Sequence, residues 1–330
     1  MCTAISYRVK DHYFGRNLDL ERSFHESVTI MPRNFSLAFR FASKMQRHHA
    51  MIGMAYVVDD YPLYYEATNE FGLSMAGLNF PVNAVYHEFD PRLNSVAPFE
   101  FIPWVLAQCK TVDEAQIALQ HVSLVNENFS ERLPATPLHW LCADADHAIT
   151  IESMADGLHV QENSVGVLTN NPPFDYHLLR LNDFMGVSSQ PPQNRFAREV
   201  ELAPYSLGMG SIGLPGDMSS SSRFIRAAFV KHNSQPAEIE SQNVHQFFHI
   251  LNSAAQPKGC TRLENGLYEY TQYSSCCNAS RGVYYYQAYH HAQIVGIDMH
   301  AEDLNASLLI TYPMDTEQQI PIQNAKGAGR

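Results

Sequence analysis

Short extended segments dominate this sequence, and they occur in blocks instead of alternating with helices. The first two, Ala4–Arg8 and Tyr13–Asn17, are typical of a hairpin across Lys10–Asp11. The later predicted strands are Met51–Val58, Leu63–Ala67, Leu73–Ala76, His139–Cys142, Ala148–Glu152, Leu158–Val160, Val165–Thr169, Tyr268–Cys276, Gly282–Tyr289, Ile294–Asp298 and Leu308–Tyr312. Strands that follow one another so closely favour antiparallel pairing, because parallel neighbours need a long crossover connection.

Three helices are predicted between the strand blocks. Thr111 and Glu114 have the spacing of a capping box, which opens a helix ending near His121. An apolar stripe at helical spacing marks 220–231, and 244–251 forms the third helix. Helices placed in this way would cover the outer faces of antiparallel sheets. We therefore expect an α+β fold.

Length and composition indicate one compact unit. The chain has 330 residues, of which 45% are hydrophobic and 17% charged, so it can bury a large core without disulfides. No linker or internal repeat divides the sequence, and we predict a single domain over 1–330. Residues 186–216 are rich in Ser, Pro, Gln and Gly and have no clear period, so we expect them to leave the core as an excursion.

Net charge and the absence of targeting signals limit the classes of partner and the compartment that we expect for this protein. With 34 acidic and 22 basic residues, the formal net charge is −12, which argues against nucleic acid or an anionic membrane as the main partner. No apolar run has the roughly 18 residues of a membrane span, and the start lacks the basic-then-apolar pattern of a signal peptide. The six cysteines show no C-x-x-C spacing. We expect a cytoplasmic protein with reduced thiols.

Two motif matches lack the context that their chemistry requires. Residues 208–213 match G-x-G-x-x-G, but Leu214-Pro215-Gly216 stands where a helix should begin. His245 and His249 are four residues apart on a predicted helix, without the glutamate of H-E-x-x-H. We therefore predict no cofactor and no metal.

Cys2 is the residue most suggestive of chemistry. Removal of Met1 would place a thiol and a free α-amine on one residue, and an amine with an ordinary pKa of about 7.7–8 suits a general base. A hairpin register would lay Phe14–Asp19 beside Cys2. Arg16 could then favour the thiolate by its charge, while Asp19 held the amine in place. The alternative is a hairpin ion pair that does no chemistry.

Several ordered motifs resemble the choloylglycine hydrolases, a cysteine branch of the N-terminal nucleophile (Ntn) hydrolases that also contains penicillin V acylases. The resemblance runs from Met1 to about Tyr312. Its segments are MCT at the start, FGRNLD (14–19), NEFGLSMAGLNFP (69–81), LHW (138–140), VLTNNPPFDYH (167–177), GLPGDMSSSSRFIRAAF (213–229), FFHILNS (247–253) and YTQYSSC…GVYYYQAY (270–289). This resemblance implies an Ntn-hydrolase αββα four-layer sandwich, with two mainly antiparallel sheets between helix layers.

The resemblance also implies a reaction and its residues. The thiolate of Cys2 would attack the amide that joins a bile acid to glycine or taurine. The Asn170 side chain and the Asn79 backbone N–H would stabilise the oxyanion, and water would clear the thioester. The implied catalytic residues are Cys2, Arg16, Asp19, Asn79, Asn170 and Arg223, with Asn171 as the alternative to Asn170 and Arg226 as the alternative to Arg223.

Substrate and assembly follow from the same resemblance. A small-molecule substrate, a conjugated bile acid, would need an apolar trough for its steroid. The matching positions are Leu18, Val58, Tyr65, Phe129 and Leu133. Residues 186–216 resemble the family's assembly loop, which implies a homotetramer; the alternative is a mobile surface loop.

Three functional hypotheses remain open at this point. Asn79 lies where bile acid hydrolases carry Asn and many penicillin V acylases carry Tyr, so it favours bile acid hydrolysis. The second hypothesis is a penicillin V or N-acyl homoserine lactone acylase of the same family. The third is a binding protein without turnover, which would be free to lose one of the matching residues, whereas all of them are present.

Overall fold

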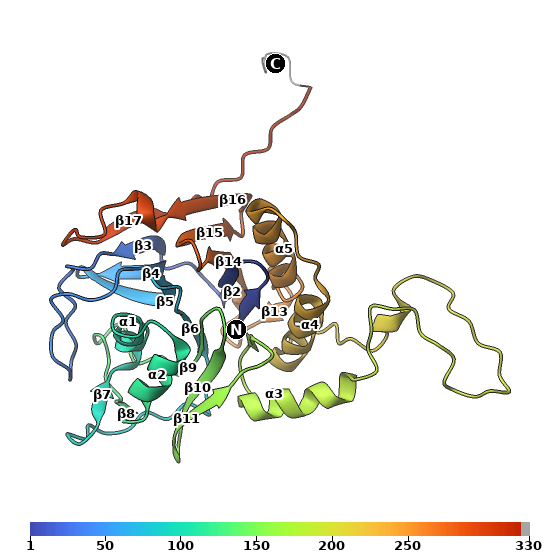
Figure 1. Cartoon of the computed structure of the whole chain (residues 1–330), viewed down its shortest axis with the longest axis horizontal. Coiled ribbons are helices and arrows are strands. Elements are labelled where there is room, and N and C mark those ends of the chain that lie inside the picture. Colours follow the sequence, from blue (N-terminus) through green and yellow to red (C-terminus); the bar gives the residue numbers. More distant parts are fainter. Residues whose placement is uncertain (325–330) are drawn as a thin grey trace.

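The computed structural model describes residues 1–324, and its core is a pair of antiparallel sheets packed face to face (Figure 1). The first sheet has seven strands in the order β12-β1-β2-β14-β15-β16, with β13 paired to β14. Its strands are β1 (Cys2–Arg8), β2 (His12–Leu20), β12 (Val167–Leu168), β13 (Thr261–Arg262), β14 (Tyr268–Asn278), β15 (Val283–Ala288) and β16 (His291–Asp298).

The second sheet has eight strands in the order β11-β10-β9-β6-β5-β4-β3-β17, and all of its pairs are antiparallel. Its strands are β3 (Ser27–Met31), β4 (Met51–Val58), β5 (Tyr61–Asn69), β6 (Ser74–Asn79), β9 (Leu138–Ala143), β10 (Ala148–Met154), β11 (Gly157–Glu162) and β17 (Ile310–Pro313). Outside both sheets, β7 (Asn94–Val96) and β8 (Val122–Leu124) form a short parallel pair.

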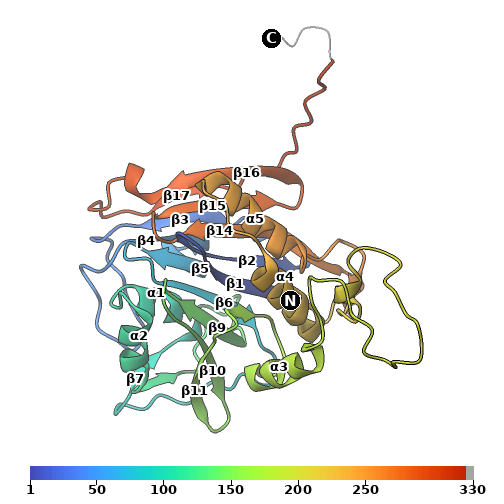
Figure 2. The ribbon, with the colours of Figure 1, turned by 45° about the vertical axis from the view of Figure 1, so that its right-hand side comes forward.

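Helices cover the outer face of each sheet (Figure 2). The pair α4 (Ser220–Asn233) and α5 (Glu240–Asn252) packs on β1, β2 and β14, whereas α1 (Phe101–Leu106) packs on β5 and β6. A single apolar cluster joins α1, α2 (Val112–Leu119) and the second sheet, and α3 (Phe174–Leu181) lies against α4. Single 3-10 turns span η1 (Pro98–Glu100), η2 (Asn182–Phe184), η3 (Met209–Ser211) and η4 (Met299–Ala301). The expected αββα sandwich is confirmed.

Most predicted elements form, with different ends. The capping interaction at Thr111 is present, since its side chain accepts a hydrogen bond from the Glu114 N–H. The predicted strand 165–169 is reduced to the two residues of β12. The sequence prediction missed β3, α1 and α3, as well as the small β7–β8 pair. Helix α1 was not predicted because it is only six residues long and contains Pro103, and proline is unfavourable inside a helix.

The hairpin at the chain start sets the direction of every side chain around it. Cys2 lies opposite Leu18, and Ala4 lies opposite Arg16. Because side chains alternate along a strand, these four residues point to the same side, towards the second sheet. Asn17 points the other way, and its side chain donates to the Leu251 carbonyl in α5. The hairpin therefore has a sheet side and a helix side.

Gly15 allows β2 and β14 to approach one another just before Arg16. A Cβ atom at Gly15 would collide with the backbone carbonyl of Ser275. Only a residue without a side chain fits there. The Arg16 N–H then reaches the Ser275 hydroxyl at 3.2 Å.

Residues 186–216 leave the body of the molecule as a long projection, with η3 as its only regular turn (Figure 1). Within the projection Phe196, Tyr205 and Leu207 are 84%, 85% and 95% exposed. Across residues 1–324, no helix combines the length and the apolar character needed to cross a membrane.

The Gly15 contact predicts a large effect of a single methyl group. Gly15→Ala should lower the free energy of unfolding by about 3 kcal/mol, because the overpacked atom meets backbone that cannot rotate away. Urea unfolding followed by circular dichroism measures this loss. The matched control is Gly186→Ala, where an added Cβ would have no neighbour within 4 Å. Equal stability of the two variants would contradict the interpretation.

Candidate active site

Cys2 begins β1 and lines a cavity of about 470 Å³ on the sheet side of the hairpin. Met1 precedes it and continues the strand ladder, because its carbonyl accepts from the Asp19 N–H at 3.1 Å and its amino group donates to the Asp19 carbonyl at 3.0 Å. The amino group of Met1 also contacts the Glu269 carboxylate. Burial lowers the pKa of this amine.

Arg16 occupies the sheet side together with Cys2. Its guanidinium donates to the backbone carbonyls of Tyr65, at 3.0 Å, and Gly77, and lies 3.9 Å from the Glu66 carboxylate. Burial acts to lower the pKa of Arg16, but the nearby Cys2 thiol and acidic groups outweigh it and raise that pKa above its usual range. The structure thus keeps a permanent cation beside Cys2.

Glu66 balances this buried cation. Its carboxylate accepts hydrogen bonds from Tyr273 at 2.8 Å, Ser275 at 2.9 Å and Tyr284. Burial raises the pKa of Glu66, while Arg16 and these three donors oppose the shift. A buried charge is tolerated only with partners of this kind.

Asp19 lies on the helix side, away from the Cys2 sulfur. One carboxylate oxygen accepts from the Thr271 hydroxyl at 2.6 Å, and the other accepts from Gln256 at 3.4 Å. The same oxygen is 3.9 Å from the Arg223 guanidinium. Asp19 therefore anchors the backbone of the chain start and does not touch the thiol.

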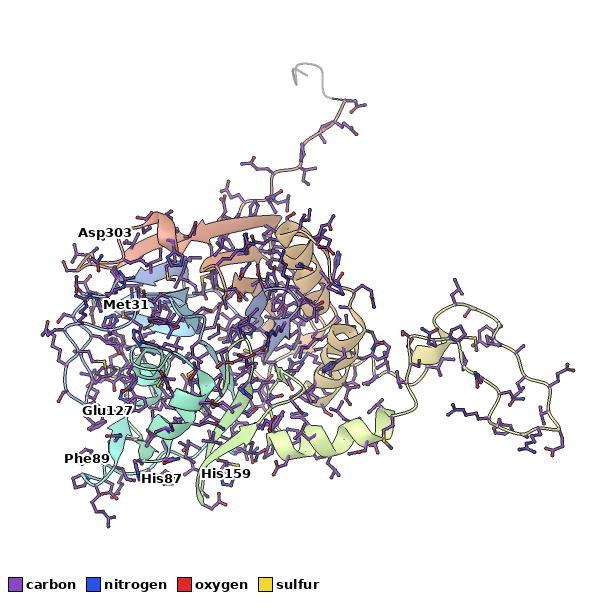
Figure 3. All side chains as sticks on the ribbon, viewed as in Figure 1. Met31, His87, Phe89, Glu127, His159 and Asp303 are labelled. Carbon is purple, nitrogen blue, oxygen red and sulfur yellow. The ribbon has the colours of Figure 1, made fainter. Side chains whose placement is uncertain are left out.

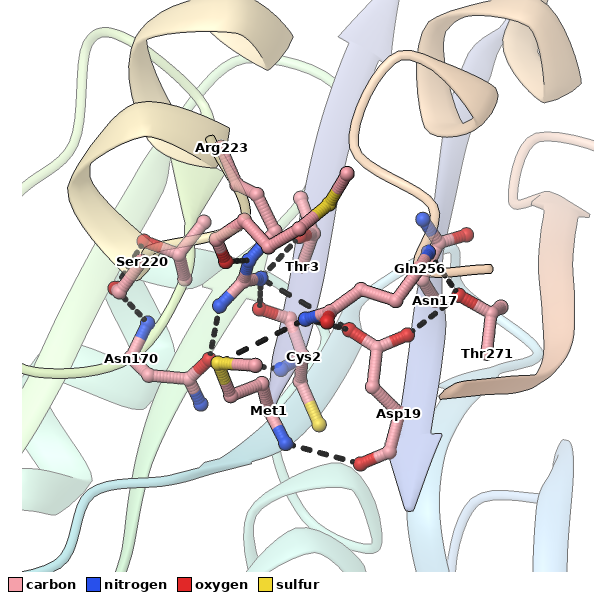
Figure 4. A network of polar contacts seen from close by, with 12 residues as sticks. Met1, Cys2, Thr3, Asn17, Asp19, Asn170, Ser220, Arg223, Gln256 and Thr271 are labelled. Atoms are coloured by element: carbon pink, nitrogen blue, oxygen red, sulfur yellow. Dashed lines mark hydrogen bonds and ion pairs between the residues drawn. The ribbon is translucent and has the colours of Figure 1, made fainter. Parts of the chain in front are cut away.

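Arg223 connects the chain start to Asn170. It lies in the first turns of α4, which begins where the Ser219 side chain caps the Ser222 N–H. Its guanidinium donates to the Cys2 carbonyl, to the Thr3 hydroxyl at 2.7 Å and to the Asn170 side-chain oxygen at 2.7 Å (Figure 4). Burial lowers the pKa of Arg223, and Asp19 opposes this. Arg223 acts as a clamp on the backbone of Cys2.

The side-chain amide of Asn170 has only one orientation that its neighbours allow. Its oxygen accepts from the Cys2 N–H at 2.7 Å and from Arg223. If the amide were flipped, its NH2 group would face these two N–H donors and could bond neither. The amide nitrogen therefore points the other way, donating to the Asn79 carbonyl at 2.7 Å. One of its two N–H groups is used by this bond, and Asn79 itself lines the cavity.

The cavity takes in four of the five residues predicted to bind substrate: Leu18, Tyr65, Phe129 and Leu133. Val58 is not among the residues that line this cavity. It is the last residue of β4, paired with Tyr61 at the hairpin turn, and Tyr56 on the same face of that strand reaches the cavity instead. Sequence reasoning also missed Phe24 and Phe99 in the wall.

Several polar partners of the site were not foreseen. Thr271 and Gln256 hold Asp19 from about 250 residues away, and Glu269 contacts the chain start. Thr271 lies in the quoted YTQY segment, where the alternation of the strand could have placed it on the helix side. Gln256 lies in a loop after α5, and no sequence pattern marks it.

Within residues 1–324, no three His, Cys, Asp or Glu side chains gather closely enough to hold a metal ion. The rings of His245 and His249 lie 4.6 Å apart on the exposed side of α5, without a third ligand.

His177 in α3 holds the backbone carbonyl of Asn170. Its Nε2 lies 2.8 Å from the Asn170 carbonyl, its Nδ1 has no partner, and its ring stacks on Phe224. Burial lowers the pKa of His177 to about 4. The folded protein therefore keeps this ring neutral, with the proton on Nε2.

This buried histidine predicts a loss of stability in acid. An unfolded chain protonates a histidine near pH 6.5, whereas folded His177 resists protonation until about pH 4, so stability falls as the pH drops between these values. From pH 7 to pH 5, His177 alone should cost about 2 kcal/mol. Urea unfolding of His177→Gln should show a correspondingly smaller loss.

The control for this experiment is His245→Gln on the exposed side of α5, which should keep the wild-type slope of stability against pH. If His177→Gln also kept that slope, the buried ring would not be the source of the acid sensitivity.

Known proteins match this chain over nearly its whole length. The model of the linear amide C–N hydrolases, choloylglycine hydrolase family, matches residues 2–312. A bile salt hydrolase/transferase from Lactiplantibacillus plantarum is 51% identical over 97% of this chain and 98% of that protein. A bile salt hydrolase/transferase from Clostridium perfringens is 39% identical over 94% of this chain and 96% of that protein.

Solved structures agree at the level of the fold. The crystal structure of the mutant C2A conjugated bile acid hydrolase from Clostridium perfringens superposes with a TM-score of 0.90 at 36% identity, covering 98% of this chain and all of that one. A penicillin V acylase from Agrobacterium tumefaciens has a TM-score of 0.75 at 18% identity, over 97% of this chain and 100% of that one, and so shares the fold.

Proposed function

We propose that this chain, which belongs to the choloylglycine hydrolase family of linear amide C–N hydrolases, cleaves the amide between a bile acid and glycine or taurine. The observation that carries the proposal is Cys2, placed at the chain start in a cavity beside a buried arginine. The relatives named as bile salt hydrolases align with nearly all of the chain, which supports the choice of substrate.

The reaction begins once Met1 has been removed. The free amine of Cys2 takes the thiol proton, and the thiolate attacks the amide carbonyl carbon. Negative charge then develops on the carbonyl oxygen, where the free N–H of the Asn170 side chain and the backbone N–H of Asn79 stabilise it. The protonated amine of Cys2 gives its proton to the departing nitrogen, and glycine or taurine leaves.

A thioester of the bile acid with Cys2 remains after this first half. Water adds to its carbonyl while the amine of Cys2 accepts a proton, and collapse of the intermediate releases the bile acid and the thiol. The names of the relatives from Lactiplantibacillus plantarum and Clostridium perfringens also include transferase, and the thioester could pass its acyl group to an amine instead of water.

The other polar residues hold the reacting groups in place. Arg16 favours the thiolate through its fixed charge on the sheet side. Arg223 fixes the Cys2 carbonyl and the Asn170 amide, and Asp19 holds the helix side of the strand end. No cofactor or metal enters this scheme.

The cavity suits an apolar body with an anionic end. Its volume of about 470 Å³ is within the range of small-molecule sites. Leu18, Tyr65, Phe129 and Leu133 would contact the steroid, whose burial contributes about 25 cal/mol per Å². Arg22 and Arg132 also line it, and their charge would offset the net negative charge of the chain towards a carboxylate or sulfonate.

Assembly and compartment are part of the same proposal. A homotetramer would cover the exposed apolar side chains of the 186–216 projection, which stands clear of the body in Figure 3. The six free cysteines suit a reducing compartment such as the cytoplasm. A penicillin V acylase remains the alternative function, and Asn79 is the residue that favours bile acid conjugates.

The nucleophile is tested by substitution. Wild-type protein without Met1 should release amine from glycocholate and taurocholate faster than from penicillin V, and Cys2→Ala should abolish all three reactions because no thioester can form. Amine release under reductant measures this. Faster cleavage of penicillin V would favour the acylase alternative, and activity that survives in Cys2→Ala would exclude the proposed mechanism.

The two neighbouring asparagines offer a matched pair for the oxyanion site. Asn170→Ala should lower kcat about 10²–10³-fold, the usual cost of removing one oxyanion donor. Asn171 donates to the Pro81 carbonyl and is not among the residues lining the cavity of Cys2, so Asn171→Ala should lose less than about tenfold. Steady-state kinetics on glycocholate compare them. The reverse order of effects would move the oxyanion donor to Asn171.

A further inference from the structure

A buried histidine–glutamate pair, which the reaction does not use, joins His139 of the LHW segment to Glu152 of β10. His139 in β9 and Glu152 in β10 lie directly opposite one another. Both are buried, with 0% and 1% exposure, and His139 Nδ1 is 2.9 Å from a Glu152 oxygen. Neither residue lines the cavity beside Cys2.

Counting donors and acceptors fixes the direction of the His139 Nε2 contact. His139 Nε2 lies 2.9 Å from the Thr169 carbonyl, which can only accept, so Nε2 donates. On the other side, the Glu152 carboxyl group lies against Nδ1 and also accepts the Phe174 N–H at 3.1 Å. Both ring nitrogens are therefore held by oxygen atoms, which fixes the orientation of the ring.

The His139 ring touches both segments that carry the oxyanion donors. Its Nε2 holds the carbonyl of Thr169, the residue before Asn170. One face of the ring stacks on Phe80, the residue after Asn79, with centroids 4.2 Å apart and planes 5° from parallel. His139 thus connects the β6 end to the loop after β12.

Further contacts make the Asn170 backbone rigid. Its N–H donates to the Ser220 hydroxyl at 2.8 Å, and its carbonyl accepts from His177 at 2.8 Å. These contacts fix the loop to α4 and α3, but neither one reaches the Asn79 segment. The Asn170 side chain itself bonds the Asn79 carbonyl, and His139 adds a second link between the two segments, through the Thr169 carbonyl and the Phe80 ring.

We propose that His139, held by Glu152 at Nδ1 and by the Thr169 carbonyl at Nε2, is a positioning residue that helps to set the distance between the Asn79 and Asn170 oxyanion donors. The inference rests on the proposed function, because it presumes that these two groups meet the same oxygen. His139 touches no substrate and acts through the Thr169 carbonyl and the Phe80 ring. His177 is close enough to both members of the pair for His139 and Glu152 to act on it electrostatically.

Two substitutions separate this role from simple filling of space. Gln places an N–H near the position of Nε2, whereas Asn reaches only the position of Nδ1. His139→Asn should therefore lower kcat about 10²-fold with little change in KM, and His139→Gln should stay within about tenfold of wild type. Alkylation of Cys2 by iodoacetamide should proceed at the wild-type rate in both variants.

The matched control is His159→Asn at the exposed edge of β11, labelled in Figure 3, where the ring bonds Asp156 at 2.8 Å. It should leave kcat unchanged. Equal losses in His139→Asn and His139→Gln would reduce the role of His139 to packing, and a wild-type kcat in His139→Asn would overturn the proposal.

A second measurement on the wild-type protein stands even if both variants fail to fold. In protein labelled with 15N-histidine, the His139 ring should show a slowly exchanging proton on Nε2, which donates to the Thr169 carbonyl. Its absence would overturn the assignment. Failure of the proposed function would instead appear as wild-type protein that leaves bile acid conjugates intact. The variant ratios would then be measured on penicillin V.

Discussion

The pairing of β1 with β2 is the constraint on which the rest of the site depends. With Cys2 opposite Leu18, alternation places the thiol and Arg16 towards the second sheet and Asp19 towards the helices. A slip by one residue would exchange these sides and separate the thiol from its cation. The register is fixed by the buried residues of the hairpin and by the close approach at Gly15, so the fold specifies the chemistry of the chain start through backbone hydrogen bonds.

Charge balance explains why so many ionisable groups lie at zero exposure around one cysteine. Arg16 is compensated by Glu66 on the sheet side, and Arg223 by Asp19 on the helix side. Each carboxylate receives additional hydrogen bonds from hydroxyl or amide groups. Loss of one partner would leave an isolated buried charge, which is far more costly than loss of the pair. The two networks lie on opposite sides of one strand and meet only through its backbone.

Local information in the sequence was sufficient for part of this site. The hairpin, Cys2, Arg16 and Asp19 all fall within the first 19 residues, where strand alternation predicts their neighbours. Asn170 and Arg223 came only from family resemblance, because nothing local connects them to Cys2. The partners of Asp19, Thr271 and Gln256, arrive through long-range strand pairing that no short pattern encodes. The residues that line a cavity are hard to predict for a related reason, because the cavity wall depends on where a hairpin turns.

The Met1–Asp19 contact has a consequence for how the enzyme comes into being. Met1 exchanges two backbone hydrogen bonds with Asp19, so the untrimmed chain already completes its strand ladder. Removal of Met1 adds no strand pairing. It deletes these two hydrogen bonds and leaves the backbone N–H and C=O of Asp19 unpaired beside the new amine of Cys2. Such groups recruit water when protein no longer satisfies them. Removal of Met1 thereby replaces the hydrogen bonds of a covalently attached residue with bound water. This water lies at the place where the second half of the reaction consumes a water molecule.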